Sequence, residues 1–355
     1  MKLKMPSGET KIVQKIKGGN LSSISKPQWL DVDGERYLFK RRVKNTFSDV
    51  GEVFVTQILD KISLPRDYYV PYIHVKTSYG KNGTICRNFL QNGEKIVMAF
   101  DVIYKNAMRK SELFMTKDEF DEKLADEMKW PYLSSVEGML KEIEEYANNR
   151  NYEIDLDDTK QKLSALFVID FFLCQYDRHA NNYGFILNHK DKTIRVAPFF
   201  DNGFALDLDL KQKYIKERLL RPKTYNSKVV LKLAYTQTES ESFENSRYFK
   251  NGGVFVADIV ELYNNNPNCK SIIDKFMALD MQSEIKLCEE TNNIILPEIY
   301  KTHMKQYYKS RYDAIEEFIN KINKRLAKSK TTSRVSLNQS SANQPKKNKE
   351  KDLSF

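Results

Sequence analysis

The sequence predicts an α+β fold with two lobes, a small β-rich N-terminal lobe and a larger, mostly helical C-terminal lobe. Two changes of pattern along the 355 residues predict this class. Over residues 1–100, short apolar runs of strand character alternate with turn residues, and one segment has helical periodicity. Over residues 101–326 most apolar residues recur at helical spacing. Residues 327–355 are rich in Lys, Ser, Thr, Asn and Gln and predict a basic disordered tail.

The first lobe is expected to contain a hairpin followed by a helix. Asp33-Gly34 lies between two short apolar runs, which is a hairpin signature. The apolar residues of 47–63 recur at helical spacing, so this segment predicts a helix that Ser48 or Asp49 caps. Strand-like runs return at 68–77, 83–90 and 95–100.

The second lobe is expected to pack around one apolar helix. Residues 163–174 read LSALFVIDFFLC. This run is shorter than the ~18 residues of a membrane span and contains Asp170, so it predicts a buried core helix, capped by Asp157. The strands of a hairpin are predicted at 183–187 and 194–200, and further helices at 119–128, 134–148, 254–263, 271–279 and 298–326.

Most of the excess positive charge lies near the C-terminus. The chain has 58 Lys and Arg against 48 Asp and Glu, a net charge of +10. Residues 321–355 contain ten of the basic and two of the acidic residues, which gives +8. The remaining body is nearly neutral, which argues against a nucleic-acid-binding body. The tail is expected to be a solvated end, and contact with nucleic acid, a membrane surface or a partner stays open.

Neither disulfides nor zinc are expected. Four cysteines, too far apart for a CxxC pair, predict buried reduced thiols: Cys86, Cys174, Cys269 and Cys288. The histidines at 74, 189 and 303 have no partners at metal-ligand spacing. The N-terminal residues contain no hydrophobic signal region, so a cytoplasmic location is expected, with release or translocation left open.

The segment CQYDRHANNYGFIL contains the residues best suited to chemistry. Asp177 and Asn182 lie on a polar loop between the apolar helix and a strand, and Asp201 follows the next strand. Transfer of a phosphoryl group from ATP needs a carboxylate near the incoming hydroxyl and hard oxygen ligands for Mg²⁺. Asp177 suits the first role, as catalytic base, and Asn182 and Asp201 suit the second. A plain turn is the alternative, because these residue types are common in turns.

The order Asp-Arg-His-x-x-Asn, hairpin, Asp-x-Gly resembles the HipA-like and CtkA-like bacterial kinases, and also the phosphoinositide kinases. Conventional protein kinases have His-Arg-Asp, whereas Arg178 and His179 follow the Asp here. The resemblance implies a two-lobed protein-kinase-like fold, ATP and Mg²⁺ as cofactors, and Asp201 as a metal ligand. Asn202 replaces the Phe of the usual Asp-Phe-Gly, which puts control of activity through that Phe in doubt.

The resemblance extends to the first lobe. The segment ERYLFK looks like the strand that ends in the ATP-binding lysine, which is Lys40 here. FSDVGEVFVTQIL looks like the helix whose glutamate pairs with that lysine, which is Glu52. A lysine positions phosphate oxygens and the glutamate orients the lysine. The alternatives are that Lys40 is one of three solvated charges and that Glu52 only favours a helix N-terminus.

Two further nucleotide contacts are expected. Gly19, Ser22 and Ser23 belong to a segment whose backbone N–H groups suit phosphate, although it has no G-x-G-x-x-G. Residues 96–100 resemble the strand entering the hinge, where the backbone around Met98 and Phe100 would meet adenine.

The function expected first is a Ser/Thr protein kinase of the HipA/CtkA-like type, with a protein substrate or the chain itself as acceptor. A phosphoinositide-like lipid or small-molecule kinase is the second expectation. A nucleotide-binding pseudokinase that acts as an interaction module is the third. The HipA-like resemblance also implies an antitoxin-like or activating partner. Self-phosphorylation is a hypothesis for the tail, whose Ser and Thr residues lie close to Arg334.

Overall fold

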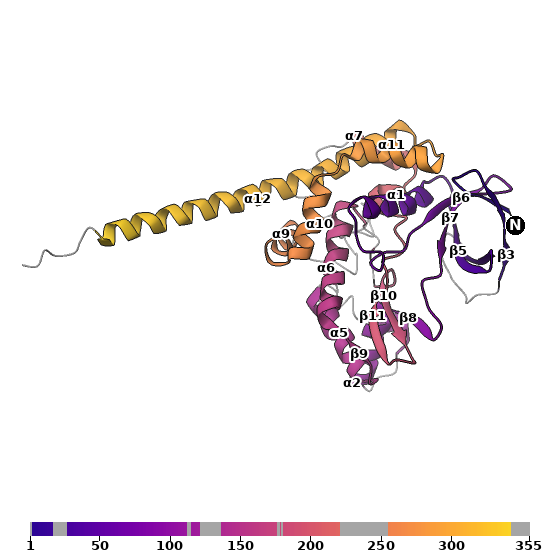
Figure 1. Cartoon of the computed structure of the whole chain (residues 1–355), viewed down its shortest axis with the longest axis horizontal. Coiled ribbons are helices and arrows are strands. Elements are labelled where there is room, and N and C mark those ends of the chain that lie inside the picture. The colour runs from indigo at the N-terminus through magenta and orange to yellow at the C-terminus, as the bar shows by residue number, and fades with distance from the viewer. Residues whose placement is uncertain are drawn as a thin grey trace, which may run out of the picture.

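The computed structural model describes residues 2–16, 27–111, 115–120, 136–175, 178, 180–220 and 255–341. Figure 1 shows the strands of the N-terminal region gathered on one side of the molecule and the helices of the C-terminal region on the other. The predicted α+β class with a β-rich first lobe and a helical second lobe is therefore confirmed.

The first lobe is a seven-stranded antiparallel sheet that closes on itself. Its strands pair in the order β2 (Thr10–Ile12), β1 (Lys2–Lys4), β6 (Ile73–Thr77), β7 (Asn82–Arg87), β5 (Glu35–Arg41), β4 (Gln28–Val32) and β3 (Gln14–Lys15). Only Val13 separates β2 from β3, so one bent segment pairs with β1 on one side and β4 on the other. The strands form a barrel, visible as a ring in Figure 1.

The inside of this barrel has its own small core, separate from that of the second lobe. Its buried members are Leu3, Val13, Leu30, Val32, Phe39, Val75 and Ile85. They alternate with outward-facing residues along their strands, as the two-residue period of a strand requires. The predicted hairpin at Asp33-Gly34 is confirmed, with Leu30 opposite Tyr37.

Helix α1 (Ser48–Lys61) packs between the barrel and the second lobe. The predicted helix is confirmed, but the predicted caps are wrong, because Phe47 occupies the N-cap without a side-chain bond. The Ser48 hydroxyl instead accepts from the Val43 amide at 3.1 Å. The buried Asp49 carboxylate is bound by Arg42 at 2.5 Å and by His74 at 3.1 Å. Both side chains therefore attach α1 to the barrel.

The second lobe is built around α6 (Leu156–Phe172), most of whose residues are buried. Its N-cap is Asp155, which accepts from the Asp158 amide, and the predicted cap Asp157 lies within the first turn. The helices around it are α2 (Ala99–Ser111), α5 (Val136–Asn148), α9 (Phe255–Asn265), α10 (Pro267–Met277), α11 (Met281–Asn292) and α12 (Glu298–Ser341). The apolar run at 163–174 is thus a core helix, as predicted.

A second sheet lies beside α6 and carries the polar loops at its ends. Its four strands pair in the order β8 (Glu94–Met98), β10 (Gly184–Asn188), β11 (Thr193–Val196) and β9 (Glu153–Ile154). The predicted hairpin of β10 and β11 is confirmed, with Phe185 opposite Val196. The strand predicted at 95–100 ends at Met98, because Ala99 and Phe100 begin α2.

Several elements differ from the prediction. The short 3₁₀ turn η1 (Ala205–Asp207), α7 (Gln212–Leu220) and α11 were not predicted. The helix predicted at 119–128 is described only up to residue 120, and the rest lies outside the described residues. Helix α12 runs to Ser341, whereas the composition of 327–341 predicts a tail without structure. This stretch contains neither Gly nor Pro to end a helix, and Figure 1 shows α12 projecting from the body.

Two exclusions can be checked over the described ranges. Within them, no helix is both long and apolar enough to cross a membrane. The four cysteines are free and buried, as predicted.

Candidate active site

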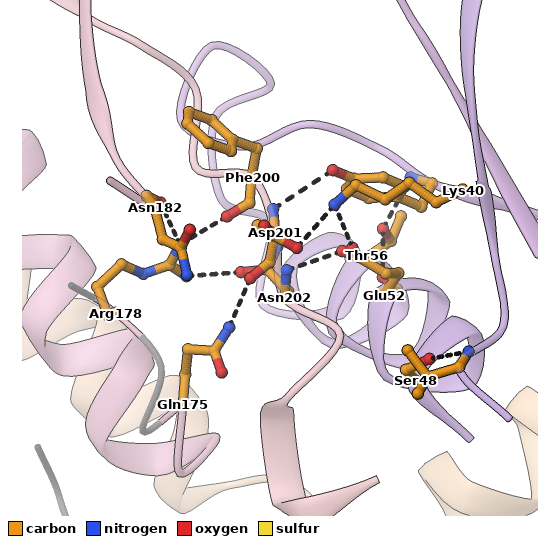
Figure 2. Close-up of polar contacts among 12 residues, drawn as sticks. Lys40, Ser48, Glu52, Thr56, Gln175, Arg178, Asn182, Phe200, Asp201 and Asn202 are labelled. Atoms are coloured by element: carbon orange, nitrogen blue, oxygen red, sulfur yellow. Dashed lines mark hydrogen bonds and ion pairs between the residues drawn. The ribbon is translucent and has the colours of Figure 1, made fainter. Parts of the chain in front are cut away.

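Three charged side chains from separate elements meet where α1, the barrel and the second lobe adjoin. Lys40 lies on β5, Glu52 on α1, and Asp201 follows β11. The Lys40 ammonium lies 2.8 Å from Glu52 Oε1 and 2.8 Å from Asp201 Oδ1 (Figure 2). The Glu52 side chain is 4% exposed, that of Lys40 13% and that of Asp201 37%. The lysine is therefore held from the buried side by Glu52, and Asp201 is the member that faces solvent.

Each charge of this cluster changes the pKa of its neighbours. Burial alone would lower the pKa of Lys40, but the carboxylates of Asp201 and Glu52 raise that pKa well above its ordinary value. Burial raises the pKa of Glu52, while the neighbouring Lys40 opposes that rise. Lys40 is therefore a fixed positive charge at neutral pH, and it lies beside the solvent-facing carboxylate of Asp201.

The turn that carries Asp201 is held by contacts to its backbone. Asp201 has a positive φ of 60°, a conformation that non-glycine residues seldom adopt. Its amide donates to the Tyr72 hydroxyl at 3.3 Å, and its carbonyl accepts from Gln175 Nε2 at 2.7 Å. The next amide, that of Asn202, donates to Glu52 Oε2 at 2.8 Å. Glu52 thus binds Lys40 with one oxygen and the Asp201 turn with the other.

Arg178 joins the polar loop after α6 to the same turn. Its guanidinium binds the Asp170 carboxylate through two contacts of 3.0 and 3.1 Å. It also donates to the carbonyls of Asn182 at 2.8 Å and Phe200 at 2.6 Å, and to Asn202 Oδ1 at 2.7 Å (Figure 2). Because Phe200 and Asn202 flank Asp201, this one side chain fixes the position of the turn relative to Asn182.

Asn202 stands where the resemblance has a phenylalanine, and it has a polar role here. Its side chain is buried and accepts from Arg178, and its amide donates to Glu52. The position therefore connects both parts of the site by hydrogen bonds, where a phenylalanine would offer only apolar contact.

The predicted site residues fall into three groups. Lys40, Glu52 and Asp201 lie together, and Asn182 is connected to them through Arg178. Asp177, Gly19, Ser22 and Ser23 lie outside the described residues.

The third group is the predicted hinge, which differs at one residue. Met98 ends β8 opposite Gly184, half-buried. The amide of Phe100 already donates to the Ala180 carbonyl at 2.9 Å, and its side chain is buried against the second lobe. Phe100 therefore supports the polar loop and does not offer its amide to a nucleotide.

Sequence reasoning missed four residues of this arrangement: Asp170, Arg178, Tyr72 and Gln175. A signal existed for the first two. Asp170 interrupts an otherwise apolar helix, and a carboxylate buried there requires a cationic or hydrogen-bonding partner. Arg178 is a basic residue eight positions later, in the polar loop. Nothing in the sequence distinguishes Tyr72 from the other tyrosines.

The donor set fits a magnesium nucleotide. Mg²⁺ prefers hard oxygen ligands and is usually held by one or two carboxylates together with substrate phosphates. Asp201 has such an oxygen beside the positive charge of Lys40. Asn182, whose backbone carbonyl is bound by Arg178, has another in its side-chain amide. Over the described ranges, no group of three or more His, Cys, Asp and Glu residues could hold a metal ion.

Asp170 predicts a pH dependence. Burial raises its pKa to about 6, against the opposing effect of Arg178. Below pH 6 the carboxylate becomes neutral and its bonds to Arg178 weaken, so the phosphoryl transfer expected from the sequence should become about tenfold slower between pH 7 and pH 5.

The free energy of unfolding responds to pH in the opposite direction. Because the folded-state pKa of Asp170 lies above the ordinary 3.8, the folded state holds an extra proton between about pH 4 and 6. Raising the pH through this window therefore lowers the free energy of unfolding by about 3 kcal/mol.

The measurements are kcat/KM and the unfolding free energy against pH, for wild type and Asp170→Asn. The variant should lose both dependences, and its activity at pH 7 should be low. If kcat/KM of the variant still fell between pH 7 and pH 5 as in the wild type, that fall would belong to another titrating group.

No family model matches the chain, and no curated protein matches it in sequence. Among solved structures, it is similar to the Helicobacter pylori proinflammatory kinase CtkA, with a TM-score of 0.57 and 18% identity over 85% of this chain and 94% of that one. It also matches HipA of Shewanella oneidensis MR-1, from a complex with HipB and operator DNA, with a TM-score of 0.38 and 9% identity over 87% of this chain and 64% of that one. The second likeness is too weak to carry an argument. The first shows a kinase-like fold, so the predicted resemblance is confirmed at the level of the fold.

Proposed function

We propose that this chain, which has a kinase-like fold shared with CtkA, is an ATP-dependent Ser/Thr protein kinase. The observation that carries the proposal is Lys40, whose largely buried ammonium lies 2.8 Å from both Glu52 and Asp201. An ion pair that only stabilises the fold needs one carboxylate, whereas Lys40 has two. A lysine shared between a buried glutamate and a solvent-facing aspartate suits the binding of phosphate oxygens beside a metal. The polar loop held by Arg178 supports the same reading.

Each residue has a distinct role in the proposed reaction. When bound, ATP supplies the γ-phosphoryl group and Mg²⁺ offsets the charge on its oxygens. Lys40 would hold phosphate oxygens, and Glu52 would keep its ammonium in place. Asn182 and Asp201 would hold the metal. Asp177 would accept the proton of the incoming hydroxyl as that oxygen bonds to the γ-phosphorus and the bond from phosphorus to the bridging oxygen breaks, which releases ADP.

The proposed acceptor is a Ser or Thr hydroxyl of a protein, with the chain itself included. Four candidate hydroxyls for self-phosphorylation lie near Arg334 in the sequence, towards the end of α12: those of Thr331, Thr332, Ser333 and Ser336. A map of phosphorylated residues after incubation with ATP tests them, and a map without sites on α12 would remove this helix as an acceptor.

The function is tested by incubating the purified chain with Mg²⁺ and γ-labelled ATP, with and without a generic acceptor protein. We expect label on protein for the wild type, and none for Asp177→Ala or Asp201→Asn, because these remove the base and a metal ligand. Asp157→Asn, which removes an exposed carboxylate in the first turn of α6, is the charge-matched control and should retain transfer.

The same assay separates the alternatives. Label that appears only on added lipid or small molecules would assign the chain to that class of kinase. ATP that binds without transfer would favour the pseudokinase, and no binding of ATP at all would refute the proposal.

A further inference from the structure

Helix α1 and the Asp201 turn touch through their backbones at two glycines. Gly51 lies in α1, one position before Glu52, and Gly203 lies two positions after Asp201. A Cβ placed on Gly51 would lie 2.8 Å from the Gly203 carbonyl oxygen and 3.1 Å from its carbon. A Cβ placed on Gly203 would lie 3.0 Å from the Ser48 carbonyl oxygen. No side chain fits between the helix and the turn at this point.

A glycine inside a helix needs a reason, because it costs about 1 kcal/mol relative to alanine. The backbone conformation supplies none, since neither Gly51 nor Gly203 is among the described glycines with positive φ. The close approach supplies it, because only glycine leaves room for the turn.

The contact lies in a row of attachments between α1 and the second lobe. At its start, the Phe47 amide donates to the Leu208 carbonyl at 2.6 Å. In the next turn, Glu52 accepts from the Asn202 amide. Farther along, Gln57 Nε2 donates to the backbone and the side chain of Glu284 on α11, at 2.8 and 2.9 Å. The helix that carries Glu52 is therefore fixed to the lobe that carries Asp201.

We propose that Gly51 is a positioning residue for phosphoryl transfer, because its bare backbone lets α1 and the Asp201 turn pack as one rigid unit. This inference rests on the proposed function and names a residue that positions its site. With α1 held against the turn in this way, Glu52 contacts both Lys40 and the Asp201 turn.

The test compares Gly51→Ala, Gly203→Ala and Gly93→Ala. In the first two, the new methyl group must push the helix and the turn apart by a few tenths of an ångström. Gly93, in the turn before β8, has a φ of 86° and open space around its Cβ position. Its substitution strains the backbone without touching the site, and it is the control for general destabilisation.

We expect kcat to fall about 10- to 100-fold in Gly51→Ala and Gly203→Ala, because small misplacements of reacting groups are costly. The Mg²⁺ concentration for half-maximal rate should rise several-fold, because Asp201 is displaced. The melting temperature of Gly51→Ala should change little, since alanine favours the helix. Gly93→Ala should lower the melting temperature and keep the wild-type kcat and Mg²⁺ requirement.

A second readout needs no activity. Hydrogen exchange of the amides of residues 199–206, measured without nucleotide, reports the Asn202–Glu52 bond. We expect exchange at least about tenfold faster in both site variants than in the wild type and Gly93→Ala. Wild-type exchange and magnesium requirement in both site variants would overturn the inference. If the wild type transfers no phosphate, the proposed function fails, and the exchange measurement still decides whether Gly51 holds the turn.

Discussion

Replacing Lys40 with methionine is expected to reduce phosphoryl transfer by at least about 1,000-fold and to destabilise the fold by about 3 kcal/mol at pH 8. The loss of transfer follows from removing the fixed positive charge beside Asp201. The loss of stability follows from Glu52, which is left as a buried carboxylate without its cation. Transfer is measured with labelled ATP, and stability by denaturant unfolding.

The instability of Lys40→Met should depend on pH with a definite sign. The folded-state pKa of Glu52 is already raised by burial, and it rises further without Lys40. A group whose folded-state pKa is above its ordinary value binds a proton on folding, so the deficit should be smaller at pH 5 than at pH 8. The double variant Lys40→Met/Glu52→Gln should recover stability and remain inactive.

Lys309→Met is the matched control, because Lys309 is exposed and pairs with Asp313 on α12. It should change stability by less than about 0.5 kcal/mol and leave transfer unchanged. A Lys40→Met protein with wild-type transfer would contradict the assignment of Lys40. A deficit that does not vary with pH would contradict the role given to Glu52 in it.

Arg178→Lys is expected to lower kcat about 100-fold and stability by about 2 kcal/mol, although the charge is kept. Lysine has a single ammonium and cannot bind Asp170 through two parallel contacts while also reaching the Asn182 and Phe200 carbonyls. The polar loop and the Asp201 turn would then lose the link that fixes one against the other. Steady-state kinetics and denaturant unfolding measure the two effects.

Arg195→Lys supplies the control, because Arg195 also binds both oxygens of one carboxylate, that of Glu94, outside the site. Arg195→Lys should lower the free energy of unfolding by at most about 1 kcal/mol and leave kcat unchanged. An equal loss of kcat in the two variants would contradict the role of Arg178 in fixing the polar loop against the Asp201 turn. The double variant Arg178→Met/Asp170→Leu should regain part of the stability without activity, because it leaves no unpaired buried charge.

The sequence predicts those elements whose pattern is local. The hairpin at Asp33-Gly34, α1 and the apolar helix α6 each have a turn signal or a period that the sequence displays. Asp201 is predicted from its place after the hairpin that follows the polar loop, and Lys40 and Glu52 are predicted through the resemblance. The Lys40–Asp201 contact itself spans 161 positions, so no local pattern encodes it. Their roles in transfer stay predictions, and so do the domain boundaries at residues 100 and 326.

The elements that escaped prediction depend on tertiary contacts. The strands β1, β2 and β3 have only two or three residues each, too few to show a period. Helix α11 buries few of its residues against α1 and α12, so its apolar pattern is weak. Two histidines to which the sequence assigned no partner are buried against carboxylates. His74 pairs with Asp49, and His303 pairs with Asp207. Such pairs appear only when distant segments meet.

The closed pairing of the first lobe limits how an extended peptide can bind. An open sheet offers unpaired backbone groups at its outer strands, and a partner can extend it by strand addition. In this barrel the bent segment of β2 and β3 occupies that position, since it bonds to β1 and β4 at once. Those two strands are the ends of the first sheet and have only three and two residues. In the described part of the chain, the outer strands of the second sheet are β8, with five residues, and β9, with two. A peptide that docks by β-augmentation would therefore find its longest outer strand in β8, which pairs with β10, the strand that follows the polar loop.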